Sequence, residues 1–276
     1  MADRLAVSTN TYHSYSLEDA LRGIAAAGFT SVELSSVPGW TEHVPRNADD
    51  EELQRIGELV TRHGLTAVSL SGHSDLASDA GTGEFRKSLH IAKVLGIQYV
   101  TTSTGGHDAS SAGSLEEQRE AFLERIRPLA DEAAADGIQI CLETHGGVSA
   151  TGAMAAELVR LIDRPNVGIN YDTANVIFYG EVRPETDIIT AAPLINHLHI
   201  KDQIGGLGVW NFPAIGTGEG DFAPVFAALE DVGFTGPCSI ELEFQGEPWP
   251  SLDAVEAALR TSLTFLRTHL PEAPLG

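Results

Sequence analysis

One pattern recurs along the chain: a helix-forming stretch ends in glycine plus an apolar residue, and a strand-like run follows at once. The copies are Gly28-Phe29, Gly64-Leu65, Gly96-Ile97, Gly137-Ile138 and Gly233-Phe234. Glycine suits the left-handed backbone conformation that terminates a helix, so each copy predicts the end of a helix and the start of a strand. This regular alternation leaves few folds open to the chain.

The chain holds eight strand-like runs in all. They read LAVSTNTY, SVELSS, LTAVSLSG, YVTTSTGG, IQICLETHG, NVGINYDT, INHLHIKD and CSIELEF, with helical stretches such as residues 17–27, 50–62, 115–135 and 252–269 between them. Strands and helices that alternate at this period predict parallel βαβ units, and eight such units close into a barrel. We therefore expect class α/β and a single-domain (β/α)8 TIM barrel over residues 1–276. An open doubly wound sheet is the alternative, because residues 183–193 offer only a short sixth helix.

The charge of the chain limits its partners, since 39 acidic residues against 17 basic ones give a net charge of −22. Nucleic acid and anionic membranes bind clusters of lysine and arginine, so neither is an expected partner. No apolar run reaches the roughly 18 residues of a membrane span, and the N-terminal residues lack the apolar core of a signal peptide. Cys141 and Cys238 lie in apolar runs and predict reduced, buried thiols, so we expect a cytoplasmic protein.

The run INHLHIKD carries polar side chains along one side of an otherwise apolar strand. Alternate residues of a strand point to opposite faces, so His197, His199 and Lys201 share one face. The same parity turns a set of polar residues on the neighbouring runs toward the barrel axis: Glu143, His145, Asn170, Asp172, Glu241 and Glu243. Active sites of these barrels lie at the carboxyl ends of the strands, which is where these residues fall.

Carboxylates and imidazoles that converge inside a barrel repel and desolvate one another unless a cation lies among them. The pattern therefore predicts one bound divalent cation, with His199 as a ligand and His197 as a deeper neighbour. Oxygen ligands with one imidazole favour Mn²⁺ first, and Mg²⁺, Co²⁺ or Zn²⁺ as alternatives.

Four motifs, CLETHGG, NYDTANV, HLHIKD and CSIELE, follow one another on the last four runs. With them the chain resembles the xylose-isomerase-like sugar phosphate isomerase/epimerase superfamily over nearly its whole length. The resemblance implies one metal ligand from each of these strands, and the matching positions are Glu143, Asp172, His199 and Glu241. Glu243 shares the inward parity of Glu241 and is the alternative ligand.

The resemblance also implies a reaction. Members that epimerise free ketoses use the two metal-bound glutamates, here Glu143 and Glu241, as acid and base on opposite faces of one substrate carbon. A metal that holds the adjacent carbonyl stabilises the enediolate formed when that carbon loses its proton. We therefore expect a metal-dependent isomerase or epimerase of an unphosphorylated keto sugar.

Two departures from the ketose epimerases make a lyase the alternative. Those enzymes have a histidine where this chain has Asn175, and an arginine after the metal histidine where this chain has Lys201 and Asp202. The HxHxKD pattern looks more like inosose dehydratases and related chains that eliminate a group from 3-keto sugars or 3-keto C- and O-glycosides. His145 would be an extra acid or base in that reaction, or else a hydrogen-bonding neighbour of the ligands.

Side chains at the strand ends and in the loops are expected to contact a sugar or keto-glycoside substrate. They are His73, His107, Asn175, Lys201 and Trp210, with Phe212 and Trp249 as further candidates, while Glu33 is expected to make a structural hydrogen bond inside the barrel. Residues 203–220 and 245–251 contain no arginine or lysine, which argues against a phosphate on the substrate. Further expected partners are a second copy of the chain and, for the eliminating alternative, a small partner subunit.

Two other classes of function fit the residues less well. A metal-dependent DNA-repair endonuclease family shares this barrel, but it needs more histidines and a basic groove. A barrel that only binds sugar would not need competent residues at all four ligand positions.

Overall fold

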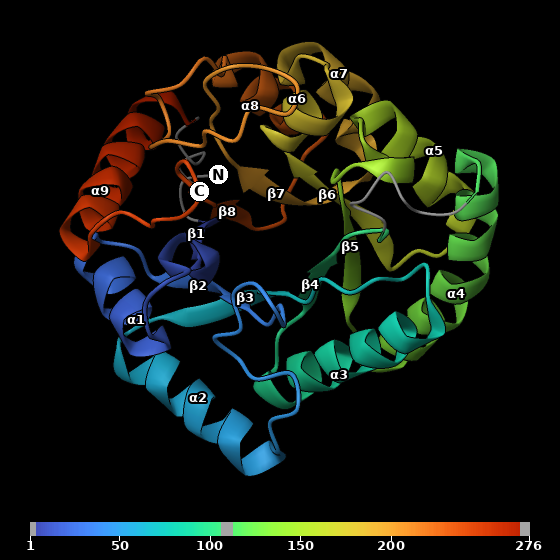
Figure 1. Ribbon diagram of the computed structural model, residues 1–276, viewed down its shortest axis with the longest axis horizontal. Helices are drawn as coiled ribbons and strands as arrows, with labels where there is room; N and C mark the ends of the chain where they lie inside the picture. The colour runs from blue at the N-terminus through green and yellow to red at the C-terminus, as the bar shows by residue number, and fades with distance from the viewer. Residues whose placement is uncertain (1–3, 106–112, 271–276) are drawn as a thin grey trace.

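The computed structural model describes residues 4–105 and 113–270, in which parallel strands close into a barrel with consecutive strands as neighbours. The strands are β1 (Leu5–Ser8), β2 (Ser31–Ser35), β3 (Thr66–Ser71), β4 (Tyr99–Thr102), β5 (Gln139–Glu143), β6 (Val167–Asp172), β7 (Ile195–Ile200) and β8 (Cys238–Ile240). β8 pairs with β1 through Leu5 and Cys238 and through Val7 and Ile240, which closes the barrel. The predicted (β/α)8 barrel is thereby confirmed, and the open-sheet alternative is wrong (Figure 1).

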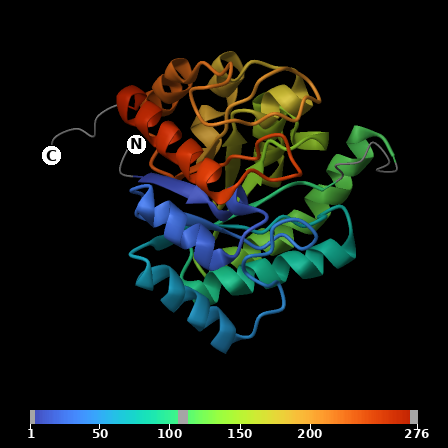
Figure 2. The ribbon, with the colours of Figure 1, turned by 60° about the vertical axis from the view of Figure 1, so that its left-hand side comes forward.

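Helices surround the strands as an outer ring (Figure 1). They are α1 (Leu17–Ala26), α2 (Asp50–Arg62), α3 (Asp79–Leu95), α4 (Leu115–Ala135), α5 (Gly152–Ile162), α6 (Asn175–Gly180), α7 (Pro184–Ala191), α8 (Phe222–Asp231) and α9 (Leu252–His269). The last of them, α9, packs beside α1, so the ring closes at the same place as the barrel (Figure 2).

The glycines that end the predicted helices have the expected backbone conformation. Gly96 ends α3 with a φ of 67°, in the left-handed region, and its N–H bonds to the last turn of the helix. The other four glycines of the repeat also have positive φ. At the opposite ends, hydroxyl and carboxylate side chains cap the first turns of α1 to α5 and of α8; Ser114 and Glu117, for example, form a reciprocal capping box at α4.

The chain after β6 differs from the expectation of one short helix. A one-and-a-half-turn helix, α6, starts directly after the strand, and α7 follows over Pro184–Ala191. The carboxylate of Asp172 nucleates α6, because its Oδ1 accepts hydrogen bonds from the N–H groups of Ala174 at 2.8 Å and Asn175 at 2.9 Å. The first predicted strand run likewise ends early, since Thr9–Tyr12 form a 3-10 helix, η2.

The two faces of the strands separate apolar from polar side chains, as the parity predicts. Leu142, Ile169, Leu198 and Ile240 are fully buried in the apolar core. The cysteines Cys141 and Cys238 are buried thiols. Within the described ranges, no helix combines the length and the apolarity needed to cross a membrane.

Candidate metal centre

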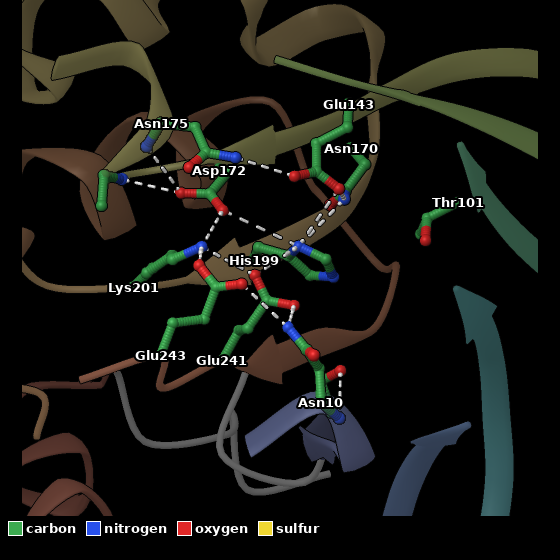
Figure 3. Close-up of polar contacts among 12 residues, drawn as sticks. Asn10, Thr101, Glu143, Asn170, Asp172, Asn175, His199, Lys201, Glu241 and Glu243 are labelled. Atoms are coloured by element: carbon green, nitrogen blue, oxygen red, sulfur yellow. Dashed lines mark hydrogen bonds and ion pairs between the residues drawn. The ribbon is translucent and has the colours of Figure 1, made fainter. Parts of the chain in front are cut away.

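The four sequence-predicted ligands lie together at the carboxyl ends of β5 to β8. Glu143 and Asp172 are the last residues of β5 and β6, His199 is next to last in β7, and Glu241 follows β8 directly. The parallel register places Asp172 beside His199. Side chains of neighbouring strands with the same inward parity therefore converge on one point (Figure 3).

The separations between these four side chains fit one shared ion. One ligand atom from each residue lies within 4.8 Å of the others, and all four residues are buried. His199 Nδ1 lies 3.4 Å from Glu143 Oε2 and 3.8 Å from both Asp172 Oδ2 and Glu241 Oε2. Ligands bound about 2.1 Å from a common cation stand roughly 3 to 4 Å apart, so small movements suffice to coordinate one.

One carboxylate oxygen of Asp172 is not satisfied by the described side chains around it. Its Oδ2 is buried and has no hydrogen-bond partner among the described residues. The pKa of the Asp172 carboxyl is raised to about 7. Burial is the largest cause, the nearby Lys201 ammonium acts in the opposite direction, and the charge of Glu143 adds to the rise. A buried carboxylate oxygen without a donor is costly, and a cation at this point would satisfy it.

Glu143 is held in place by side-chain amides and a histidine. Asn170 Nδ2 donates to Oε2 at 2.9 Å, Asn175 Nδ2 donates to Oε1 at 2.8 Å, and His73 Nε2 lies 3.1 Å from Oε2. Burial alone would raise the pKa of Glu143, but His199, His73 and His145 together outweigh it and hold that pKa well below its usual range. The carboxylate is therefore ionised and fixed in orientation.

Glu241 and Glu243 share the buried ammonium group of Lys201. Lys201 Nζ lies 2.9 Å from Glu241 Oε2, forms a close ion pair with Glu243, and lies 3.7 Å from Asp172 Oδ2. The geometry thus groups Glu241 with the other predicted ligands, whereas Glu243 belongs with Lys201. Lys201 thus supplies one positive charge to a group of four carboxylates, those of Glu143, Asp172, Glu241 and Glu243 (Figure 3).

The imidazole of His199 is oriented from the far side by Glu33 on β2. His199 Nε2 lies 2.9 Å from Glu33 Oε2, so the Nε2–H donates there and Nδ1 faces the cluster. Glu33, His197 and His199 also form a second group of potential ligands. Hydrogen bonds already satisfy this group, because His197 bonds to Asn170 and Ser69.

We conclude that the residues present fit a divalent cation at the first group. The group offers one imidazole nitrogen and three carboxylates, one of which has an orphaned oxygen. This donor set suits Mn²⁺, Mg²⁺, Co²⁺ or Zn²⁺.

A cavity of about 280 Å³ opens onto the cluster. Of the residues expected to contact a substrate, His73, Lys201 and Trp210 line it, as does the candidate acid or base His145. His145 Nε2 lies 3.4 Å from the hydroxyl of Tyr179, at the edge of the cavity. His107 lies outside the described residues.

Other predicted contacts are placed differently. Asn175 is buried behind Glu143 and supports that carboxylate. Trp249 does not line the cavity; its indole N–H donates to the carbonyl of Thr11 at 3.0 Å. Phe212 is buried below the lysine, with Lys201 Nζ 4.5 Å from the ring centre.

Sequence reasoning missed six residues that line the cavity, namely Asn10, Ser35, Val37, Trp40, Ser71 and Tyr179. Asn10 follows β1 at the carboxyl end of the barrel, and this position alone was a usable signal. Trp40 and Tyr179 reach the mouth from longer connections, whose course the sequence does not fix.

Comparison with known proteins points to sugar-converting enzymes. The chain is 26% identical over 236 residues to an L-ribulose 3-epimerase of Methylomonas sp. (strain DH-1), covering 80% of this chain and 77% of that enzyme. It is 29% identical over 175 residues to an inosose dehydratase of Klebsiella pneumoniae subsp. pneumoniae, covering 55% of this chain and 58% of that enzyme.

Solved structures share the fold along the whole chain. A D-psicose 3-epimerase crystallised in the presence of D-fructose has a TM-score of 0.78 at 21% identity, covering 97% of this chain and 99% of that one. The IOLI protein with a bound zinc atom has a TM-score of 0.79 at 21% identity, covering 98% and 100%. The family described as the xylose isomerase-like TIM barrel matches residues 21–269. The protein therefore belongs to the xylose isomerase-like TIM barrel family.

Proposed function

We propose that the protein is a divalent-metal-dependent isomerase or epimerase of an unphosphorylated keto sugar. The observation that carries the proposal is that two buried glutamates from different strands, Glu143 and Glu241, both line the cavity and both approach His199 Nδ1, at 3.4 and 3.8 Å (Figure 3). The names of the epimerase relatives support the same reaction class.

In this proposal Glu143, Asp172, His199 and Glu241 hold the cation. The bound ion would act as a Lewis acid toward a substrate oxygen next to the carbon that loses its proton. Glu143, ionised and fixed by Asn170 and Asn175, takes a proton from one face of the substrate carbon. Glu241, protonated at the start of this step, gives its proton to the other face and is left as a carboxylate beside the Lys201 ammonium.

Elimination is the second candidate, and the position of His145 favours it. His145 lies on the cavity wall, apart from the four proposed ligands, where it would protonate a departing group. The inosose dehydratase relatives fit this reaction. The first proton abstraction is common to both reactions.

One experiment separates the two reactions. The metal-loaded protein is incubated with free ketoses, inososes and 3-keto glycosides in D₂O, and products are followed by NMR and ultraviolet absorbance. An epimerase returns a ketose that carries deuterium at the inverted carbon. Formation of an enone with loss of water or an aglycone would replace the proposed reaction by elimination.

The glycine-rich loop after β7 supports the choice of an unphosphorylated substrate. Backbone amides of this loop could cradle a phosphate, but they already bind the carboxylate of Asp202. Gly216 N and Gly218 N donate to Oδ2 at 2.9 and 2.8 Å, and Gly220 N donates to Oδ1 at 3.0 Å. The amides that could bind a phosphate are thus already occupied by a carboxylate of the same chain.

We therefore expect kcat/KM for a free ketose to exceed that for its phosphate ester. The ratio is expected to be more than about 100, because a phosphate beside four carboxylates meets like charges that cost several kcal/mol. Paired assays of each accepted ketose and its terminal phosphate measure the ratio. Equal or better turnover of the ester would contradict the prediction.

The affinity for the cation is expected to depend on pH. Asp172 must lose its proton to bind a cation, and its pKa of about 7 makes the proton a competitor. Affinity therefore falls by up to about tenfold per pH unit as the pH drops through that pKa. Calorimetric titration of the apoprotein with Mn²⁺ from about pH 8 to about pH 5 measures this, and a flat profile would contradict it.

A further inference from the structure

A row of polar side chains, hydrogen-bonded from His13 inward, leads from the rim of the barrel to two of the glutamates at the site. It runs from Glu247 through His13, Thr41 and Asn10 to Glu241 and Glu243. Asn10 and Thr41 are buried, whereas Glu247 is more than half exposed. The row joins segments after β1, β2 and β8, which are far apart in the sequence.

The inner end of the row fixes the orientation of the Asn10 amide. Asn10 Nδ2 donates to Glu241 Oε1 at 3.1 Å and to Glu243 Oε1 at 3.0 Å (Figure 3). In the opposite orientation the amide oxygen would face two carboxylate oxygens without a donor between them. Only one orientation of Asn10 is therefore compatible with both glutamates.

This orientation dictates the direction of the next two hydrogen bonds. Asn10 Oδ1 lies 2.6 Å from Thr41 Oγ1 and accepts, so the hydroxyl donates to it. A hydroxyl has only one hydrogen, so Thr41 must accept from His13 Nδ1, also at 2.6 Å. His13 therefore carries a proton on Nδ1, and Nε2 is left facing Glu247 Oε1 at 3.5 Å.

Packing holds the His13 ring in the position that this requires. The ring stacks on Trp40, with 4.2 Å between centroids and 26° between planes. Trp249 covers it from another side at 5.1 Å. A ring flip that exchanged Nδ1 for carbon would break the contact with Thr41.

We propose that Asn10 is a positioning residue for Glu241 and Glu243, and that Thr41 and His13 hold its amide in the donating orientation. By occupying Oε1 of both glutamates, Asn10 turns Oε2 of Glu241 toward Lys201 and His199. The inference rests on the proposed function in one respect, since Glu241 is there a ligand of the cation.

The first test uses Thr41→Val, which keeps the size of the side chain and removes the hydroxyl. Without this hydroxyl the Asn10 amide is free to turn, and Glu241 loses the hydrogen bond that orients it, so the Co²⁺ dissociation constant should rise about 10-fold or more. Thr41→Ser restores the hydroxyl and should return affinity to near the wild-type value. Thr102→Val is the matched control, because its buried hydroxyl bonds, among the residues that the structure describes, only to the neighbouring Ser103 carbonyl. Wild-type Co²⁺ affinity in Thr41→Val would overturn the inference.

A second test needs neither metal nor substrate. Nitrogen-15 NMR of the apoprotein should show His13 with its proton on Nδ1, and Thr41→Val should release the ring to the other tautomer. An Nε2–H tautomer in the wild-type protein would overturn the inference. If the wild-type protein bound no Co²⁺, the proposed metal site would fail, and the His13 tautomer would still decide the role of this row.

Discussion

Replacing Asp172 by asparagine is expected to weaken divalent-cation binding by more than about 100-fold. This exceeds the loss expected when a residue that only orients a ligand is replaced. The neutral amide cannot supply the anionic oxygen, and the repulsion between Asp172 and the carboxylates of Glu143 and Glu241 disappears. The amide oxygen still accepts from the N–H groups of Ala174 and Asn175, so the start of α6 and the barrel should persist. Calorimetric titration with Mn²⁺ and Co²⁺ measures the loss.

The matched control is Asp187→Asn on α7. Asp187 also accepts a backbone N–H, that of Gly152 at 2.6 Å, but it lies outside the cluster. Asp172→Ala should lose the cation as well, and it should also destabilise the protein by about 1–3 kcal/mol because two buried N–H groups lose their acceptor. Full metal occupancy in Asp172→Asn would remove Asp172 from the proposed ligands.

The second large effect is expected from the two glutamates that we propose as acid and base. Glu143→Gln and Glu241→Gln should each reduce turnover by about 10²- to 10⁴-fold, because glutamine cannot accept or return a proton. Both variants are measured at saturating metal, so that weaker cation binding does not contribute. Deuterium incorporation from D₂O is the assay.

Glu243→Gln tests the specificity of this result. Glu243 is equally buried and bonds to Lys201 and Asn10, but it lies outside the ligand group. Its replacement should cost much less turnover than either of the other two. If Glu243→Gln were the inactive variant and Glu241→Gln retained activity, the roles of these two residues would have to be exchanged.

Much of the fold follows from local rules that the sequence displays. A glycine such as Gly96 ends a helix through its own backbone preference, so the alternation of helices and strands is visible without tertiary information. Strand parity likewise places Glu143 and His199 on the inner face, whatever the details of packing. Closure of the barrel then brings the ends of β5 to β8 together.

The contacts between distant segments could not be predicted in this way. The bond from His199 to Glu33, and that from Asn10 to Glu241, join opposite parts of the chain. Both bonds depend on the side-chain rotamers, and the position of His199 also follows a register shift between β6 and β7 at Ile169 and Asn170. Trp249 is a further example. Its position in the loop after β8 suggested that it contacts a substrate at the mouth of the cavity, but it packs against His13 and Phe244 and is buried.

The internal anion of the β7–α8 loop has a thermodynamic consequence. Because Asp202 already orders the amides of Gly216, Gly218 and Gly220, no ligand is needed to fix the course of this loop. A substrate that enters the cavity beside Trp210 then loses little affinity to the conformational entropy of this segment. Substitutions in the β7–α8 loop that leave Asp202 in place should therefore change which molecules fit the mouth of the cavity. The backbone of the loop should keep its course.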